Sequence, residues 1–207
     1  IVANNYGDGV KLWGSGSKVE NTLIYGTGYP RPSDTTPWAL LVIDTDDPNA
    51  RIDIINCTLF DDDRRPAHYA MTIQYDYCSG QNQNPITVVM KNNIIAGLHR
   101  VFIRNCVNLI AENNLFYNRT DPEGVQVVID GVSTYTSNNI SSLGPGNIYG
   151  DPLFVRPEWG PNGDFHLQSG SPAIDNGSSS NAPSIDLEYN SRPLGSSFDI
   201  GAYEYVA

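Results

Sequence analysis

The stretches Lys91-Asn92-Asn93-Ile94-Ile95 and Glu112-Asn113-Asn114-Leu115-Phe116 decide the fold, because they are two copies of one pattern. In each copy a short strand-like run ends in Asn and is followed by apolar residues. The further copies are Val2-Ala3-Asn4-Asn5-Tyr6, Val19-Glu20-Asn21-Thr22-Leu23-Ile24, Ile55-Asn56-Cys57-Thr58-Leu59-Phe60 and, more weakly, Ser137-Asn138-Asn139-Ile140. A short motif that recurs along a chain indicates a repeat architecture.

The spacing of the copies predicts stacked coils with insertions. The first Asn of each copy stands at position 4, 21, 56, 92, 113 or 138, so the steps are 17, 35, 36, 21 and 25 residues. A coil of three short strands with turns takes about 20 to 25 residues, and solenoids place their insertions on one face. We therefore expect the insertions at residues 28–37, 61–66 and 78–85 to form the walls of a groove.

Physical chemistry supports an all-β solenoid. Runs such as Val125-Gln126-Val127-Val128-Ile129 have the length and patterning of half-buried strands, which bury their inward side only when coils stack. Asn tolerates the left-handed backbone conformation of tight corners, and stacked Asn side chains bond one another along an axis. The repeated Asn residues are therefore predicted to form corners and polar ladders of a parallel β-helix.

Composition excludes two classes of partner. The 207 residues carry a formal net charge of -11, and their 12 Lys and Arg are scattered, which argues against binding nucleic acid. No apolar run approaches the ~20 residues that span a membrane. The negative charge also disfavours unaided binding of a polyanion, unless a divalent cation reverses the local sign. The cysteines, Cys57, Cys78 and Cys106, are predicted to be buried structural thiols.

The start of the chain lies inside a patterned segment. Ile1 immediately precedes the first Asn copy, so we expect no signal peptide in this sequence. Three interpretations stay open, namely a truncated chain, a processed fragment, or a helix whose open end is covered by another copy. An open first coil predicts an end-to-end homo-oligomer.

The end of the chain carries a family resemblance. Residues 1–150 resemble the coils of pectin-lyase-like proteins, which are right-handed parallel β-helices, and residues 151–207 resemble the turn-rich C-terminal cap of many secreted bacterial members. The motifs in order are Gly150-Asp151-Pro152-Leu153-Phe154, Gly163-Asp164-Phe165-His166-Leu167, Gly170-Ser171-Pro172-Ala173-Ile174-Asp175-Asn176-Gly177, Asp186, Arg192-Pro193 and Asp199-Ile200-Gly201-Ala202-Tyr203-Glu204-Tyr205. The resemblance implies a bacterial protein that is secreted or on the cell surface and that acts on a polysaccharide.

The capping segment is expected to fold back over the last coil, because the end of a solenoid exposes an apolar face and unpaired strand edges. Its recurring carboxylates, Asp175, Asp186 and Asp199, are predicted to hold backbone N–H groups of tight turns. A structural calcium ion is the alternative.

Lyases of this family neutralise a uronate carboxylate, usually with calcium, and abstract a proton with Lys or Arg. The resemblance therefore makes Lys91, Arg100 and Arg104 the candidate catalytic residues, with His99 beside them as a substrate contact. Arg100 and Arg104 are an even number of residues apart, so they share a strand face if the strand is unbroken. Outward charges without a catalytic role are the alternative.

The candidate cation site is Asp44, Asp46 and Asp47, whose alternating carboxylates suit calcium, and a solvated acidic turn is the alternative. Trp13, Trp38 and Tyr75 are candidate platforms for sugar rings.

The function predicted from the sequence is that of an extracellular polysaccharide lyase-like protein that binds or cleaves a polysaccharide. Glycoside hydrolysis is the second enzymatic choice, and its two carboxylates would come from Asp44, Asp46, Asp61 or Asp63. A non-catalytic carbohydrate-binding protein or a surface adhesin segment is the alternative of a different class.

Overall fold

A computed structural model describes residues 1–3, 8–26, 39–61, 69–75, 85–97, 100–104, 106–121, 123–158 and 160–207, and of Tyr75 it describes the backbone alone. Among these residues the regular elements are β-strands and one short 3-10 helix, η1 (Ile140–Leu143). The predicted all-β class is confirmed. The insertion predicted at residues 28–37 lies outside the described residues, as do most of those at 61–66 and 78–85.

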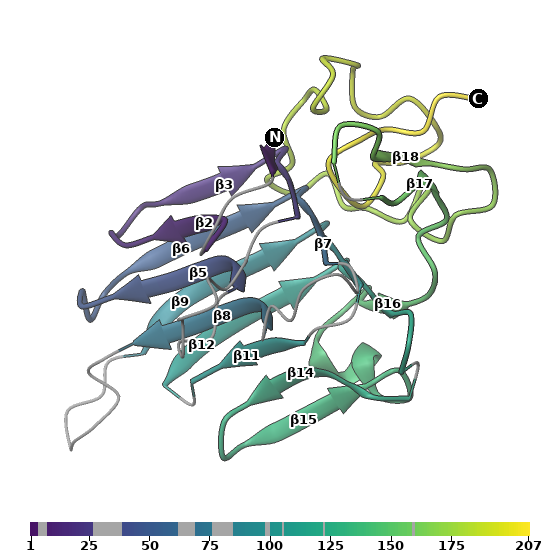
Figure 1. Cartoon of the computed structure of the whole chain (residues 1–207). Helices are drawn as coiled ribbons and strands as arrows, with labels where there is room; N and C mark the ends of the chain where they lie inside the picture. Colours follow the sequence, from purple (N-terminus) through teal and green to yellow (C-terminus); the bar gives the residue numbers. More distant parts are fainter. Residues whose placement is uncertain are drawn as a thin grey trace.

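Most strands belong to three sheets (Figure 1). The first sheet holds β1 (Val2–Ala3), β4 (Leu23–Tyr25), β7 (Thr58–Phe60), β10 (Ile94–Gly97), β13 (Leu115–Asn118) and β16 (Ile148–Tyr149). The second holds β2 (Val10–Leu12), β5 (Ala39–Thr45), β8 (Tyr69–Tyr75), β11 (Val101–Ile103), β14 (Val125–Ile129) and β15 (Ser133–Thr136). The third holds β3 (Lys18–Glu20), β6 (Arg51–Ile55), β9 (Ile86–Lys91) and β12 (Val107–Glu112).

The pairing is parallel throughout these sheets except at the last strand of the second sheet. There β15 pairs with β14 in the antiparallel sense. In each sheet the parallel partners differ by three in strand number, so the chain visits the three sheets in turn and returns one strand further on. We call each such passage a coil. A separate antiparallel pair, β17 (Phe154–Arg156) with β18 (Asp164–Leu167), follows the coils.

Alternating side chains fill the space between the sheets. In β9, Ile86, Val88 and Met90 point inward, and the register sets Val88 beside Ile52 of β6 and Leu109 of β12. Each inward residue therefore rests on an apolar residue of the coil before and after it. The core is continuous along the stack because no single coil can bury its own inward side.

The first sheet is buried on both faces. Its residues Ile24, Leu59 and Ile95 point into the core between the sheets. Their neighbours Leu23 and Ile94 belong to a second apolar cluster, which they form with the C-terminal segment. Strands covered on both sides read as continuous apolar runs rather than alternating ones, as the sequence of β4 and β10 does.

Asn residues turn the chain from the third sheet into the first. Asn21, Asn56, Asn92 and Asn113 each have a φ between 46° and 54°, a left-handed conformation that Asn adopts more readily than most residues. The residue that follows each of these Asn residues points inward. The corner therefore carries an outer row of side chains, from the left-handed Asn residues, and an inner row, from the residues that follow them. The predicted corner role of these Asn residues is confirmed.

The inner row is a buried amide ladder made by Asn93, Asn114 and Asn147. The side-chain oxygen of Asn114 accepts the backbone N–H of Asn93 at 3.0 Å, and that of Asn147 accepts the N–H of Asn114 at 3.0 Å. The amide nitrogens donate onward, from Asn93 to Asn114 at 2.9 Å and from Asn114 to Asn147 at 2.9 Å. The ladder continues to Cys57, whose backbone N–H is accepted by Asn93. The predicted ladder of stacked Asn side chains is therefore confirmed at Asn93 and Asn114. Its last rung is Asn147, and the predicted copy Ser137-Asn138-Asn139-Ile140 does not belong to it.

The C-terminal segment covers a side of the stack, which differs from the predicted cover over the last coil. Phe154, Phe165 and Ile200 of this segment pack on the outer face of the first sheet (Figure 1). The physical reason is the apolar outer face of that sheet, which needs a cover along its whole length. The last coil is instead closed by β15 and η1, from which Ile140 is buried in the core.

The outer Asn row fastens the C-terminal segment to successive coils. Asn21 donates to the carbonyl of Ile185, and Asn56 donates to those of Asp199 and Gly201. In the following coils, Asn92 donates to Ser178 and Asn113 donates to Asn176. The same corner residues that turn the chain therefore hold its tail.

A fully buried ion pair lies where the tail meets the first coil. Arg192 Nη1 is 2.5 Å from Glu204 Oε1, and neither side chain is exposed. Arg192 also donates to the carbonyl of Gly201 and to the side-chain oxygen of Asn21, while Glu204 accepts the backbone N–H groups of Leu194 and Asp199. Such a pair is tolerable away from water because its remaining polar groups are hydrogen-bonded.

The cysteines depart in part from the sequence expectation. Cys57 is a buried free thiol, as predicted, and its burial raises the pKa to about 12. Cys106 is disulfide-bonded, which corrects the prediction of a structural thiol there. Cys78 lies outside the described residues.

Removing one rung of the inner ladder should destabilise the fold strongly. In Asn114→Ala the N–H of Asn93 and the carbonyl of Met90 lose their buried partner, so we expect unfolding to be easier by about 3 kcal/mol or more. The midpoint of urea denaturation measures this change. Asn138→Ala, at the exposed copy of the motif, is the matched control and should shift the midpoint little. Equal shifts in the two variants would contradict the structural role of the ladder.

Candidate functional site

The outward side of the second sheet carries most of the predicted site residues that the structure describes. The register aligns Lys11, Val42, Thr72, Phe102 and Val128 in one outward row that crosses five strands. Asp44 has the same parity as this row on β5, and Trp13, Arg100 and Arg104 have it directly beyond the ends of β2 and β11. The sheet therefore presents these groups on one surface, which we call the arginine face and define by Lys11, Trp13, Tyr69, Arg100, Phe102 and Arg104.

Three cations on the arginine face lie over aromatic rings. Lys11 Nζ is 4.8 Å from the centre of the Trp13 ring, Arg100 Cζ is 5.9 Å from that of Tyr69, and Arg104 Cζ is 5.7 Å from that of Phe102. The Tyr69 and Phe102 rings lie 5.5 Å apart on neighbouring strands. Trp13 is 55% exposed, so part of its ring is open to a ligand.

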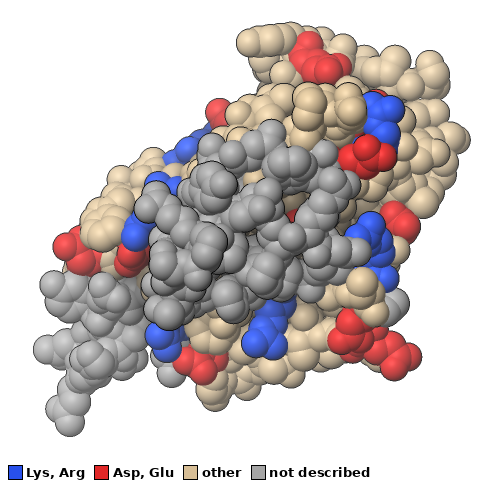
Figure 2. Space-filling model, in the orientation of Figure 1, with Lys and Arg blue, Asp and Glu red and all other residues tan. Residues whose placement is uncertain are grey.

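Two of these cations are also ion-paired. Lys11 Nζ lies 2.8 Å from Asp44 Oδ2, and Arg104 Nη1 lies 3.3 Å from Asp130 Oδ2. Basic and acidic side chains also stand side by side on the described surface in Figure 2. Arg100 is exposed, and its contact with the described part of the chain is with the Tyr69 ring.

Lys91 lies on another sheet. It ends β9 of the third sheet, it is 9% exposed, and its Nζ is 2.7 Å from Glu112 Oε2 of β12. The structure therefore brings Arg100 and Arg104 together but sets Lys91 apart from them. The position of Lys91 directly before the corner residue Asn92 is the sequence signal for the third sheet.

The three candidate metal ligands have different surroundings. Asp44 is ion-paired with Lys11, Asp47 accepts the backbone N–H of Asn49 within a turn, and Asp46 is exposed. Throughout the described residues, no three His, Cys, Asp or Glu side chains are grouped so as to hold a metal ion. The calcium site stays a prediction.

Three predicted contact residues cannot be placed on this surface. Trp38 and His99 lie outside the described residues, and so does the side chain of Tyr75. Phe102 is an aromatic residue of the arginine face that the sequence prediction missed. The alternation around Val101 and Ile103 would have placed Phe102 on the same side as the two arginines.

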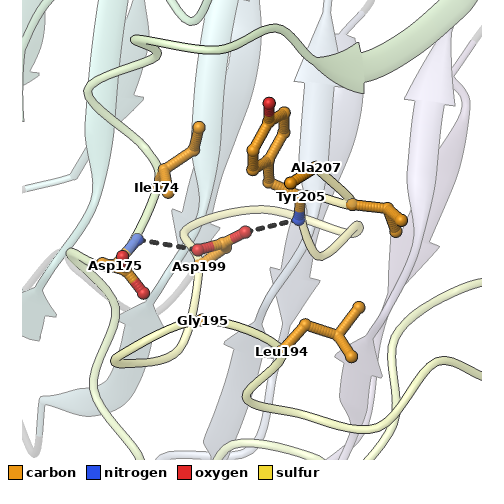
Figure 3. Close-up of a pocket in the computed structure, with 8 residues that line it drawn as sticks. Ile174, Asp175, Leu194, Gly195, Asp199, Tyr205 and Ala207 are labelled. Atoms are coloured by element: carbon orange, nitrogen blue, oxygen red, sulfur yellow. Dashed lines mark hydrogen bonds between the residues drawn. The ribbon is translucent and has the colours of Figure 1, made fainter.

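A cavity of about 400 Å³ lies within the C-terminal segment, and Asp199 is one of the residues that line it (Figure 3). The two oxygens of Asp199 accept the backbone N–H groups of Asp175 and Tyr205, at 2.7 and 2.6 Å. Asp175 in turn accepts the N–H of Ser197, and Asp186 accepts those of Glu188, Asn190 and Glu204. The prediction that these carboxylates hold turns is confirmed. Burial raises the pKa of Asp199 to about 6.

His166 joins two parts of the C-terminal segment. Its Nδ1 is 2.6 Å from Asp164 Oδ1, its Nε2 is 3.1 Å from Glu188 Oε2, and its ring lies 4.4 Å from that of Tyr203. A neutral imidazole has a single N–H, so both contacts are favourable only for the charged ring. Burial lowers the pKa of His166, but the hydrogen bonds to Asp164 and Glu188 outweigh it and raise the pKa above 6.5.

The charge on His166 should make stability depend on pH. Because its pKa is raised on folding, its contribution is fully present below pH 6.5 and is lost as pH rises through the raised value. We expect the unfolding free energy of the wild type to exceed that of His166→Asn by most near pH ~6 and by little near pH ~9. Urea denaturation at both pH values measures the difference. Asp199 titrates in the wild type and in the variant alike, so its effect cancels from this difference. A difference that stays constant with pH would contradict a charged His166.

Comparison with known proteins found no match to a family model, to a curated protein or to a solved structure. Among the described residues, no helix is long and apolar enough to cross a membrane.

Proposed function

We propose that this chain is a right-handed parallel β-helix that binds a polysaccharide across its arginine face. The parallel strands that return every third element support the solenoid. The observation that carries the function is the set of cations over aromatic rings on one sheet, at Lys11 of β2 and at Arg100 and Arg104 beside β11. Aromatic rings pack on the C–H face of sugars, and guanidinium groups donate to hydroxyl and carboxylate oxygens.

The rigidity of the surface favours binding of an extended chain. Phe102 and its neighbours sit on strands whose backbone is paired on both sides, so the groups are held in place before a ligand arrives. Neighbouring strands are about 4.8 Å apart. An extended polymer that crosses them would contact the exposed groups at the two ends of the row, because Val42 and Thr72 between Lys11 and Phe102 are only 7% and 4% exposed. A preformed surface loses little conformational entropy on binding.

Binding is better supported than cleavage. A lyase of the resembled kind needs a base close to its arginines, and Lys91 lies on the third sheet in an ion pair with Glu112. Arg100 and Arg104 would then contact the substrate, and the base, if one acts, would come from another residue. The acidic balance of the chain favours a neutral polymer, or an acidic one whose charge is offset by a divalent cation that arrives with it.

An extracellular setting is part of this proposal. The disulfide at Cys106 supports it, because disulfides persist in secreted and cell-surface proteins and are rare in the cytosol. The bacterial origin rests on the resemblance of the C-terminal motifs alone.

Affinity electrophoresis through gels that contain acidic or neutral polysaccharides, with calcium or with EDTA, tests the proposal. At least one polymer should retard the wild type, and Arg100→Ala should weaken that binding about tenfold because it removes a charged donor. Arg51→Ala is the matched control, since Arg51 lies on the third sheet beside Asp53 and should leave binding unchanged. Equal loss in both variants, or no retardation by any polymer, would overturn the proposal.

The same samples distinguish binding from cleavage. Unsaturated products that disappear with EDTA would establish a calcium-dependent lyase, and new reducing ends without unsaturation would establish a hydrolase. Stable polymer would establish binding alone.

A surface-structural role is the second candidate function. The strands β1, β2 and β3 each end their sheet on the same side of the stack, so each has one edge without a strand partner among the described residues. Such edges pair readily with other strands.

End-to-end association through these edges should appear as a dimer or larger particle. Light scattering across a range of concentrations measures the mass, and Val10→Pro should reduce association, because proline removes a backbone donor from the edge strand β2. A monomer at every concentration would exclude the structural alternative.

A further inference from the structure

A second outward row crosses the second sheet, two positions further along the strands than the row that contains Lys11. In it, Asp44 of β5 is the register partner of Gln74 of β8. The register of β11 with β8 and with β14 sets the next two residues of the row, and that of β2 with β5 sets its first. We call this set the polar row and define it by Trp13, Asp44, Gln74, Arg104 and Asp130.

Backbone hydrogen bonds keep the polar row in line. The N–H of Arg104 donates to the carbonyl of Ile73 at 3.1 Å, and the N–H of Asp130 donates to that of Ile103 at 2.8 Å. The strand pairing therefore continues to Arg104 and Asp130, which lie directly beyond the ends of β11 and β14. Because Ile73 and Ile103 point into the core, the side chains of Gln74 and Arg104 that follow them point outward.

The middle of the polar row is open to a ligand. The side chain of Arg104 is 48% exposed, that of Asp44 is 18% exposed, and Gln74 between them is partly exposed. In the neighbouring row, Val42 and Thr72 on the same two strands as Asp44 and Gln74 are buried. A polymer that crosses the coils would therefore meet the polar row between the two ends of the arginine face.

The cations at the polar row are matched by carboxylates. Asp44 lies 2.8 Å from Lys11 Nζ, and Asp130, whose side chain is 47% exposed, lies 3.3 Å from Arg104 Nη1. In both pairs the carboxylate comes from the coil that follows its cation. The charges of the two pairs cancel, and Gln74 between them adds none.

We propose that the polar row binds an uncharged polysaccharide, and that Asp44 and Asp130 exclude polyanions from it. A sugar hydroxyl both donates and accepts, and the row offers carboxylates that accept, a guanidinium that donates and the Gln74 amide that does both. An anionic group of an acidic polymer would instead lie against Asp44 or Asp130. It would also find the charges of Lys11 and Arg104 already offset, and such like-charge contacts suppress a wrong partner.

This inference rests on the proposed function, because it names the class of polymer that the arginine face binds and the residues that select it. Arg100 lies at the opposite end of β11 from Arg104 and is not part of the row. The net charge of -11 acts in the same direction as Asp44 and Asp130, since it repels a polyanion from a distance.

Affinity electrophoresis of the full chain with EDTA present compares the two classes of polymer. Hydroxyethylcellulose, galactomannan and dextran are the neutral probes, and polygalacturonate and alginate are the acidic ones. At least one neutral polymer should retard the wild type, and neither acidic polymer should. Raising NaCl from about 0.05 to about 0.5 M should change the neutral Kd by less than about twofold, because salt screens charges and not hydroxyl contacts. Retardation by an acidic polymer as strong as by every neutral one would overturn the inference, and so would a larger response to salt.

The amide at the middle of the row gives a second test. Gln74→Ala should raise the Kd for the neutral polymer about fivefold, because it removes a donor and an acceptor from the row. Asn108→Ala, which removes an exposed amide from the third sheet, is the matched control and should bind as the wild type does. Unchanged binding by Gln74→Ala would overturn the polar row as the binding surface.

Removing the two carboxylates should change the class of polymer that binds. The double variant Asp44→Asn/Asp130→Asn keeps the size of both side chains but leaves the charges of Lys11 and Arg104 without their partners. It should bind polygalacturonate or alginate with a Kd at least about tenfold below that of the wild type. Its binding of the neutral polymer should change little.

The matched control is Glu20→Gln/Asp53→Asn on the third sheet. It removes the same two charges and leaves one Lys and one Arg, Lys18 and Arg51, without their ion pairs. It should gain no binding of acidic polymers, and an equal gain in both double variants would overturn the role of Asp44 and Asp130. The polymer preference and the salt response of the wild type need no variant, so the test stays decisive if a variant fails to fold.

The outcomes separate the two proposals. If only acidic polymers retard the wild type, the arginine face stands as a polysaccharide site and the inference of a neutral ligand fails alone. If no polymer of either class retards it, the proposed function fails and this inference fails with it.

Discussion

Amide groups of asparagine at one corner of the coils hold the stack together. A coil of three short strands gains little stability alone, so its corner must join the coils before and after it. The inner ladder does this without water, since each of Asn93, Asn114 and Asn147 both accepts and donates inside the core. Because an unmet buried polar group is costly, the ladder fixes the register of β7, β10, β13 and β16, the strands that follow its rungs.

The tail depends on the same corner. Its apolar residues cover the outer face of the first sheet, and its backbone carbonyls accept from the outer Asn row. Arg192 and Glu204 then join the tail to itself and to Asn21 of the first coil. The C-terminal segment therefore covers the outer face of the first sheet. The exposed cations and aromatic rings of the arginine face belong to the second sheet.

The sequence predicted those features that depend on local pattern. Repeated Asn residues identified the corners, and alternation identified strands with one inward side, because both are properties of a few neighbouring residues. The even spacing of Arg100 and Arg104 likewise places them on one side of β11. The sheet to which Lys91 belongs also follows from a local feature, its position directly before the corner residue Asn92. The lateral path of the tail and the disulfide at Cys106 depend on contacts between distant segments, which no local pattern contains.

The length of the tail is matched to the number of coils. Each outer Asn meets a different carbonyl of the tail, at Ile185, Asp199, Ser178 and Asn176 for successive coils. Adding one coil would lengthen the stack by about 4.8 Å and leave one corner amide without a carbonyl of the tail to which it could donate. The tail therefore fits one particular number of coils. If a coil were duplicated or lost in evolution, the sequence of the tail would have to change with it.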